Sequence, residues 1–166
     1  DKPSAHYGLL PPGPSAEHLG PNDYYYWDDF WGIAGLKEAI TAAEILGRKN
    51  DVNTFERYLR RFKKDVEASL KSAEDRLGEP IIPASPYRRM DSGAIGGVVA
   101  LYPLRILDPF DPRIVNTIRF LRERCLYDGA FFHDFIHSGL NCYLTCHIIE
   151  CLIYQKKKDV WPMIKR

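Results

Sequence analysis

The sequence predicts an all-helical protein built from αα-hairpins, on three observations. Apolar residues recur at three- and four-residue steps, most clearly from Phe55 to Leu77, with charged residues between them. Glycines and prolines such as Gly47, Gly78 and Pro112 separate these stretches. No stretch shows the alternation typical of a half-buried strand. The elements therefore alternate helix, short turn, helix and longer loop.

We expect residues 1–26 to be irregular, because their prolines and glycines break helices and ladders. A first helix should run from near Trp27 to Leu46. The second should begin at Asp51 or Asn53, the third at Asp91 or Ser92, and the fourth at Asp111-Pro112. A fifth should cover 138–154, and a sixth should begin at Asp159. A closed toroid is the natural arrangement of such hairpins, and 27–166 would form about half of one.

Composition excludes several classes of partner. The 166 residues carry a formal net charge of +1, so no strong field would draw the chain to nucleic acid or to an anionic membrane. No apolar run approaches the roughly 20 residues that span a bilayer. The chain lacks an initiator methionine and a signal segment, and it stops just after a new apolar segment begins. We therefore expect a fragment of a longer protein.

The four cysteines are unevenly spaced. Cys142, Cys146 and Cys151 share one predicted helix, and Cys125 precedes it. This is not the framework of a secreted disulfide-rich fold, so we expect free thiols and a cytoplasmic location. A metal site is the alternative, but no Cys-x-x-Cys or His-x-x-x-His pair completes a tetrahedral set. The pattern favours thiols in the core, with no metal and no cofactor.

The segment from Asp23 to Trp31 is dense in aromatic and acidic residues. Aromatic faces stack on the apolar faces of sugar rings, and carboxylates accept hydrogen bonds from sugar hydroxyls. Both types within nine residues at a helix start indicate a carbohydrate subsite. The alternative is a small aromatic core beneath the proline-rich loop, with Asp28 or Asp29 capping the helix.

This segment also carries a resemblance. Gly8-Leu9-Leu10-Pro11, followed by Tyr24-Tyr25-Tyr26-Trp27-Asp28-Asp29-Phe30-Trp31, resembles a pattern of the six-hairpin (α/α)6 glycoside hydrolases, which include glucoamylases and debranching-type glucosidases. In that family the final acidic residue binds hydroxyls of the sugar being cleaved, and Asp29 occupies its place. An arginine precedes it in glucoamylase-like members, where this chain has Asp28. The resemblance therefore implies a divergent branch.

Later segments resemble the same enzymes in order and spacing. They are Leu101–Leu107 with Asp111-Pro112-Arg113, and the Gly- and His-rich stretches 127–133 and 137–145. The resemblance implies that 1–166 is a fragment of a larger catalytic toroid. It also implies a set of substrate contacts on the open loop face, namely Tyr25, Trp27, Asp28, Asp29, Trp31, Glu17, His133 and His137. Glu17 and the histidines lie in loops and can equally be solvated or bind their own loops.

Glycoside hydrolysis generally uses two carboxyl groups that flank the scissile bond. Asp91 is the candidate general acid, because it lies at the next loop-to-helix junction on the same face. The adjacent Arg88 and Arg89 favour a charged carboxylate, which argues against that role, and a simple helix cap is the alternative. The sequence shows no good partner for Asp91, so we expect the isolated chain to be inactive.

Three functions remain open. The chain can be part of a glycoside hydrolase, with carbohydrate and the remainder of the catalytic domain as partners. It can be a non-catalytic helical module that binds carbohydrate or a protein through the same aromatic face. It can also be a structural hairpin repeat without a small-molecule site. A half-toroid would leave hairpin faces that the missing half covers, so we also expect self-association through this apolar surface.

Overall fold

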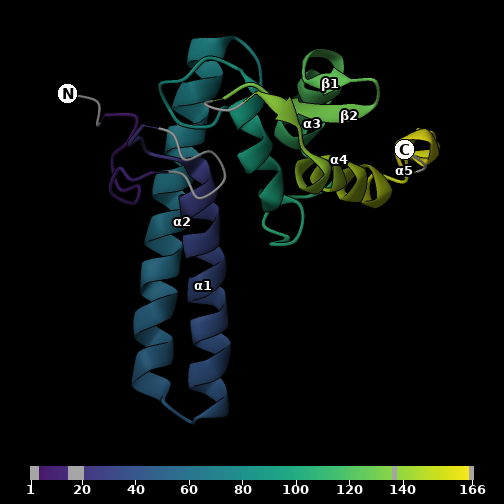
Figure 1. Cartoon of the computed structure of the whole chain (residues 1–166). Coiled ribbons are helices and arrows are strands. Elements are labelled where there is room, and N and C mark those ends of the chain that lie inside the picture. Colours follow the sequence, from purple (N-terminus) through teal and green to yellow (C-terminus); the bar gives the residue numbers. More distant parts are fainter. Residues whose placement is uncertain (1–3, 15–20, 136–137, 165–166) are drawn as a thin grey trace.

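The computed structural model describes residues 4–14, 21–135 and 138–164, and most of these are helical. Helices α1 (Tyr26–Ile45) and α2 (Lys49–Leu77) form a long antiparallel hairpin that projects from the rest of the molecule (Figure 1). Gly47 and Gly78 end the two helices with positive φ angles of 67° and 80°, as predicted.

The start predicted for α2 was wrong. The turn at Gly47 is so tight that the helix begins at Lys49, directly after Arg48. Asp51 lies in the first turn instead of preceding it, and its carboxylate forms an ion pair with Arg48. The negative charge still lies at the positive end of the helix dipole.

The predicted third helix is a shorter 3-10 helix, η1 (Ser92–Ala100), and all nine of its residues are buried. A Cβ atom at Gly97 would lie 2.7 Å from Cγ2 of Ile82, so the glycine allows η1 to pack closely against the loop that contains Ile82. The next helix, α3 (Pro112–Arg124), begins as predicted, with Asp111 accepting a hydrogen bond from the Arg113 N–H at 2.9 Å.

A small antiparallel sheet corrects the expectation of an all-helical chain. Its strands lie in the order β1 (Leu126–Tyr127), β2 (Ala130–His133) and β3 (Gly139–Leu140). Asp128 and Gly129 form the turn between the first two strands, with φ angles of 50° and 81°. An Asp-Gly pair is a known hairpin signal, but strands of two to four residues are too short to show alternation.

Helix α4 (Cys142–Tyr154) begins four residues later than predicted, because β3 occupies Gly139 and Leu140. The Asn141 side chain caps it by accepting the Leu144 N–H at 3.0 Å. Two short elements follow, η2 (Lys158–Val160) and α5 (Trp161–Ile164), where a sixth helix was predicted. No helix in the described part of the chain is long and apolar enough to cross a membrane.

The core lies where α1, α2, η1, α3 and α4 meet. Its large buried side chains include Tyr26, Phe30, Leu70, Ile95, Ile114, Leu121 and Leu144. Both α1 and α4 pack against η1. The start of α1 therefore lies near η1 and α4, while the far end of the α1–α2 hairpin extends away from them (Figure 1).

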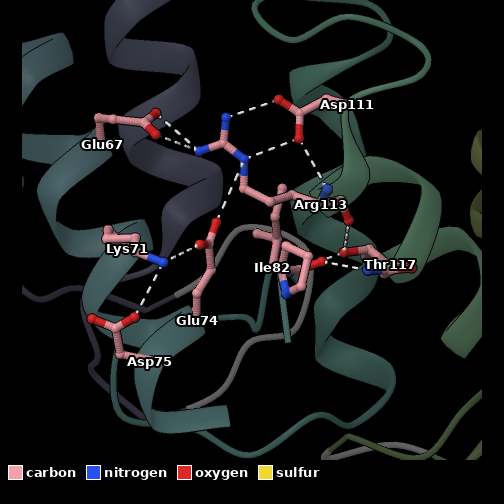
Figure 2. A network of polar contacts seen from close by, with 10 residues as sticks. Glu67, Lys71, Glu74, Asp75, Ile82, Asp111, Arg113 and Thr117 are labelled. Carbon is pink, nitrogen blue, oxygen red and sulfur yellow. Dashed lines mark hydrogen bonds and ion pairs between the residues drawn. The ribbon is translucent and has the colours of Figure 1, made fainter. Parts of the chain in front are cut away.

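A polar network fixes α3 and the loop before η1 (Figure 2). Arg113 donates to both carboxylate oxygens of Glu67 on α2, at 2.8 and 2.9 Å, and to Asp111 at 2.8 Å. The Thr117 hydroxyl oxygen accepts the Ile82 N–H at 2.9 Å and donates to the Arg113 carbonyl at 2.7 Å. These bonds position the loop that ends in Arg88 and Asp91.

Candidate functional site

The first turns of α1 and α4 and the segment after β2 come together around η1. Trp27, at the start of α1, contacts His147 of α4 with ring centroids 6.4 Å apart. The Asp134 N–H, just after β2, donates to the Ser92 hydroxyl at 3.3 Å. We call the surface formed by Trp27, Asp28 and Trp31 the aromatic–acidic face. The positive dipole end of α1 lies here, and it favours negatively charged or electron-rich groups.

Trp27, Asp28 and Trp31 are neighbours on the first turns of α1 because side chains three and four positions apart share a helix face. The two indole centroids lie 5.8 Å apart, and the Trp31 side chain is 43% exposed. Asp28 is partly buried, and burial raises the pKa of its carboxyl group. Among the described residues, none donates a hydrogen bond to this carboxylate. The face therefore combines two indole rings with an available acceptor.

Asp29 lies in a different environment from Asp28. It is 1% exposed, and one carboxylate oxygen accepts the Leu10 N–H at 2.9 Å, while the other has no partner among the described residues. Burial raises the pKa of Asp29 to about 7, against the opposing effect of the Leu10 hydrogen bond. The carboxylate thus holds the loop of Gly8 to Pro11 in place. The substrate contact predicted for Asp29 stays a prediction, and Asp28 is its more accessible neighbour.

Tyr25 is also directed away from solvent. Its ring is 2% exposed, and its hydroxyl donates to the Pro21 carbonyl at 2.8 Å. Burial raises its pKa, and the carboxylate of Asp23 adds to the effect. The ring is therefore part of the packing beneath the proline-rich loop, as the alternative interpretation of this segment held. It is not available for stacking on a ligand.

Asp91 serves as a helix cap. One carboxylate oxygen accepts the Gly93 N–H at 2.9 Å, and the other pairs with Arg88 at 2.8 Å. The Arg88 guanidinium in turn lies 4.1 Å from the centre of the Phe135 ring. Each carboxylate oxygen thus accepts one hydrogen bond, one from the capped N–H group and one from the arginine. The cap interpretation accounts for Asp91, and the role of general acid is not needed to explain its position.

Of the predicted loop residues, Glu17 and His137 lie outside the described residues. His133 lies on β2, is 4% exposed, and its ring centroid is 6.2 Å from that of Phe131. It faces the interior and not the aromatic–acidic face.

Two residues of α4 that lie near this face were not predicted from the sequence. His147 is 6% exposed, its Nδ1 atom has no partner among the described residues, and burial lowers its pKa, so its ring is neutral at neutral pH. Tyr143 packs edge-on against it at 4.7 Å and is 61% exposed. Their spacing of four residues at a helix start is the signal that could have identified them.

A groove of about 460 Å³ lies one turn further along α1. It is lined by Leu10, Gly32, Leu36, Tyr58 and Phe62, together with Gly8, Arg61 and Asp65. Gly32 follows Asp28 by four residues, so the groove begins beside the aromatic–acidic face. Its lining is mainly apolar, with an ion pair between Arg61 and Asp65 at 3.8 Å.

The cysteines divide into two pairs. Cys125 and Cys151 are buried, as predicted, and burial raises their pKa values to about 11 and about 12. Cys142 and Cys146 are exposed, which corrects the expectation that they belong to the core. The described residues contain no group of three or more metal-binding side chains.

Comparison of the chain with protein-family models, with curated proteins and with solved structures found no match.

Proposed function

We propose that this chain binds carbohydrate at the aromatic–acidic face, as part of a helical toroid of the glycoside hydrolase type. The observation that carries the proposal is the surface of Trp27, Asp28 and Trp31, two indole rings beside a carboxylate that no described residue engages. Sugars present alternating apolar C–H faces and hydroxyl donors. An indole ring covers the former, and a carboxylate accepts from the latter.

The surroundings of the face suit an extended ligand. The exposed Tyr143 of α4 packs on the buried His147 ring that contacts Trp27, so a further aromatic side chain lies near the face. On the other side, the groove at Gly32 has room for a neighbouring residue of an oligosaccharide, with the exposed Tyr58 ring at its border. These features support oligosaccharides over monosaccharides as the ligand class.

Hydrolysis requires a second, suitably placed carboxyl group. Burial raises the pKa of the Asp28 carboxyl group, whereas both oxygens of Asp91 accept hydrogen bonds from the protein. We propose that the complementary carboxylate belongs to a part of the parent enzyme outside this chain. The isolated chain should then bind sugar without cleaving it, and chromogenic aryl glycosides test this directly.

A non-catalytic binding module is the second candidate. The double engagement of Asp91 favours it, because the residue best placed by sequence to act as an acid is occupied as a helix cap. Measurable release of the aryl group that disappears in Asp28→Asn would contradict the module. It would also contradict the proposal that the second carboxylate lies outside this chain.

Tryptophan fluorescence tests the binding site. The chain has three tryptophans, and Trp161→Phe leaves only those of the face. In this background, maltose- and trehalose-type oligosaccharides should change the emission saturably. Asp28→Asn should weaken binding at least about tenfold, because a charged acceptor is lost.

The matched control is Glu38→Gln, which removes an exposed carboxylate further along the same helix. It should bind as the Trp161→Phe parent does. An unchanged emission with every sugar, or equal affinities for the two variants, would overturn the proposed site.

A further inference from the structure

Two exposed thiols lie on one side of α4. Cys142 is the first residue of the helix and Cys146 the fifth, and both are free and exposed. Side chains four positions apart on a helix are neighbours, with Cβ atoms about 5–6 Å apart. The two sulfur atoms can therefore approach a common ligand without any change of the backbone.

The first turn of α4 is fixed by its own contacts. Asn141 caps it through the Leu144 N–H at 3.0 Å. The Thr145 hydroxyl donates to the Asn141 carbonyl at 2.7 Å and accepts the Phe131 N–H of β2 at 2.9 Å. The thiols thus lie on a rigid frame, which lowers the entropy cost of bringing two donors to one ion.

We propose that Cys142 and Cys146 form a two-thiolate site for a soft monovalent cation, with Cu(I) as its representative. Thiolates select soft ions, and Cu(I) accepts two of them in a near-linear arrangement. Zinc requires about four protein ligands in a structural site. The described residues provide no group of three or more metal-binding side chains, so a two-coordinate ion fits this pair better than zinc.

Binding replaces two S–H bonds by two Cu–S bonds and releases two protons to solvent. No electron is transferred, since copper enters and remains as Cu(I). The product, Cu(SR)₂⁻, carries a net negative charge. It forms at the positive end of the α4 dipole, which favours it. The buried thiols of Cys125 and Cys151 take no part.

The test is an anaerobic titration with Cu(I) against a coloured Cu(I) chelator, on dilute protein kept reduced. One equivalent should bind to the unmodified chain. Cys142→Ser and Cys146→Ser should each weaken binding at least about tenfold, because a single thiol cannot chelate. Far-UV circular dichroism should show that both variants retain their helices, as expected for exposed positions.

A matched control tests whether Cu(I) binding needs two neighbouring thiols or only two thiols on the surface. In the Cys142→Ser background, Ile153→Cys restores a second exposed thiol, but it lies seven residues from Cys146, about 10 Å along the helix axis. This variant should still bind Cu(I) weakly. Equal binding by the control and the unmodified chain, or no effect of either serine substitution, would overturn the site.

Discussion

At the scale of single residues, Asp28 and Asp29 show why neighbours in sequence can lie in different environments. An α-helix turns by about 100° per residue, so one carboxylate lies on the accessible face and the next points beneath the Leu10 loop. The sequence placed both at a helix start but could not give the rotation of the helix relative to that loop. The resemblance to glycosidases therefore selected Asp29, whereas the packing makes Asp28 available.

The raised pKa of Asp29 predicts a pH-dependent stability. The folded value is about 7, against an ordinary value of 3.8, so the folded state binds more protons in between. The stabilising contribution of the protonated acid is complete below about pH 4 and is lost as the pH rises toward about 7. Asp29→Asn cannot ionise. We expect it to remove this loss, which is on the order of a few kcal/mol.

Urea unfolding at a series of pH values, followed by circular dichroism, measures this effect. The unfolding free energy of the unmodified chain should fall from mildly acidic to mildly basic pH, relative to that of Asp29→Asn. Glu38→Gln, at an exposed position of the same helix, should follow the unmodified chain. Parallel pH profiles for Asp29→Asn and the unmodified chain would contradict the assignment.

At the scale of elements, helix ends could be predicted where nearby residues determine them. The glycines after α1 and α2 and the Asp111-Pro112 start of α3 gave the helix limits to within a few residues. The short strands and the 3-10 form of η1 could not be predicted, because both depend on distant contacts. Phe132 pairs with Leu140 across a loop, and Gly97 packs against Ile82.

The ion pair that links α3 to α2 predicts the effect of replacing Arg113. Arg113 is 13% exposed in its side chain and bonds both Glu67 and Asp111 (Figure 2). Arg113→Met should lower the unfolding free energy by about 2 kcal/mol, because the partly buried carboxylate of Asp111 loses its donor. Arg113→Lys should recover only part of the lost unfolding free energy, because an ammonium group cannot bond both carboxylates as the planar guanidinium does.

The control for this prediction is the exposed pair of Arg119 and Glu79, at 3.1 Å on the surface. Arg119→Met should change the unfolding free energy by less than about 0.5 kcal/mol, as solvent screens such pairs. Chemical denaturation compares the variants. Losses of the same size at the two arginines would show that burial of the network adds nothing.

At the scale of the whole molecule, the sequence indicated only some of the residues that the structure brings together at the candidate site. Trp27, Asp28 and Trp31 came from one segment with a recognisable pattern. Tyr143 and His147 come from α4, and only the packing of α4 near the start of α1 brings them to the same place. Such neighbours depend on tertiary structure and have no signal of their own in a single sequence.

The distribution of apolar surface predicts self-association. Helix α4 has one charged residue, Glu150, among thirteen, and the exposed Ile153, Trp161 and Ile164 follow along α4 and α5. A helix this apolar is usually covered on all sides. Light scattering during size-exclusion chromatography should show the average mass rising from micromolar to millimolar protein. Trp161→Lys with Ile164→Lys should suppress this rise, whereas Ile45→Lys at the far tip of the hairpin should not. A monomer at every concentration would show that the apolar surface of α4 and α5 is tolerated in water.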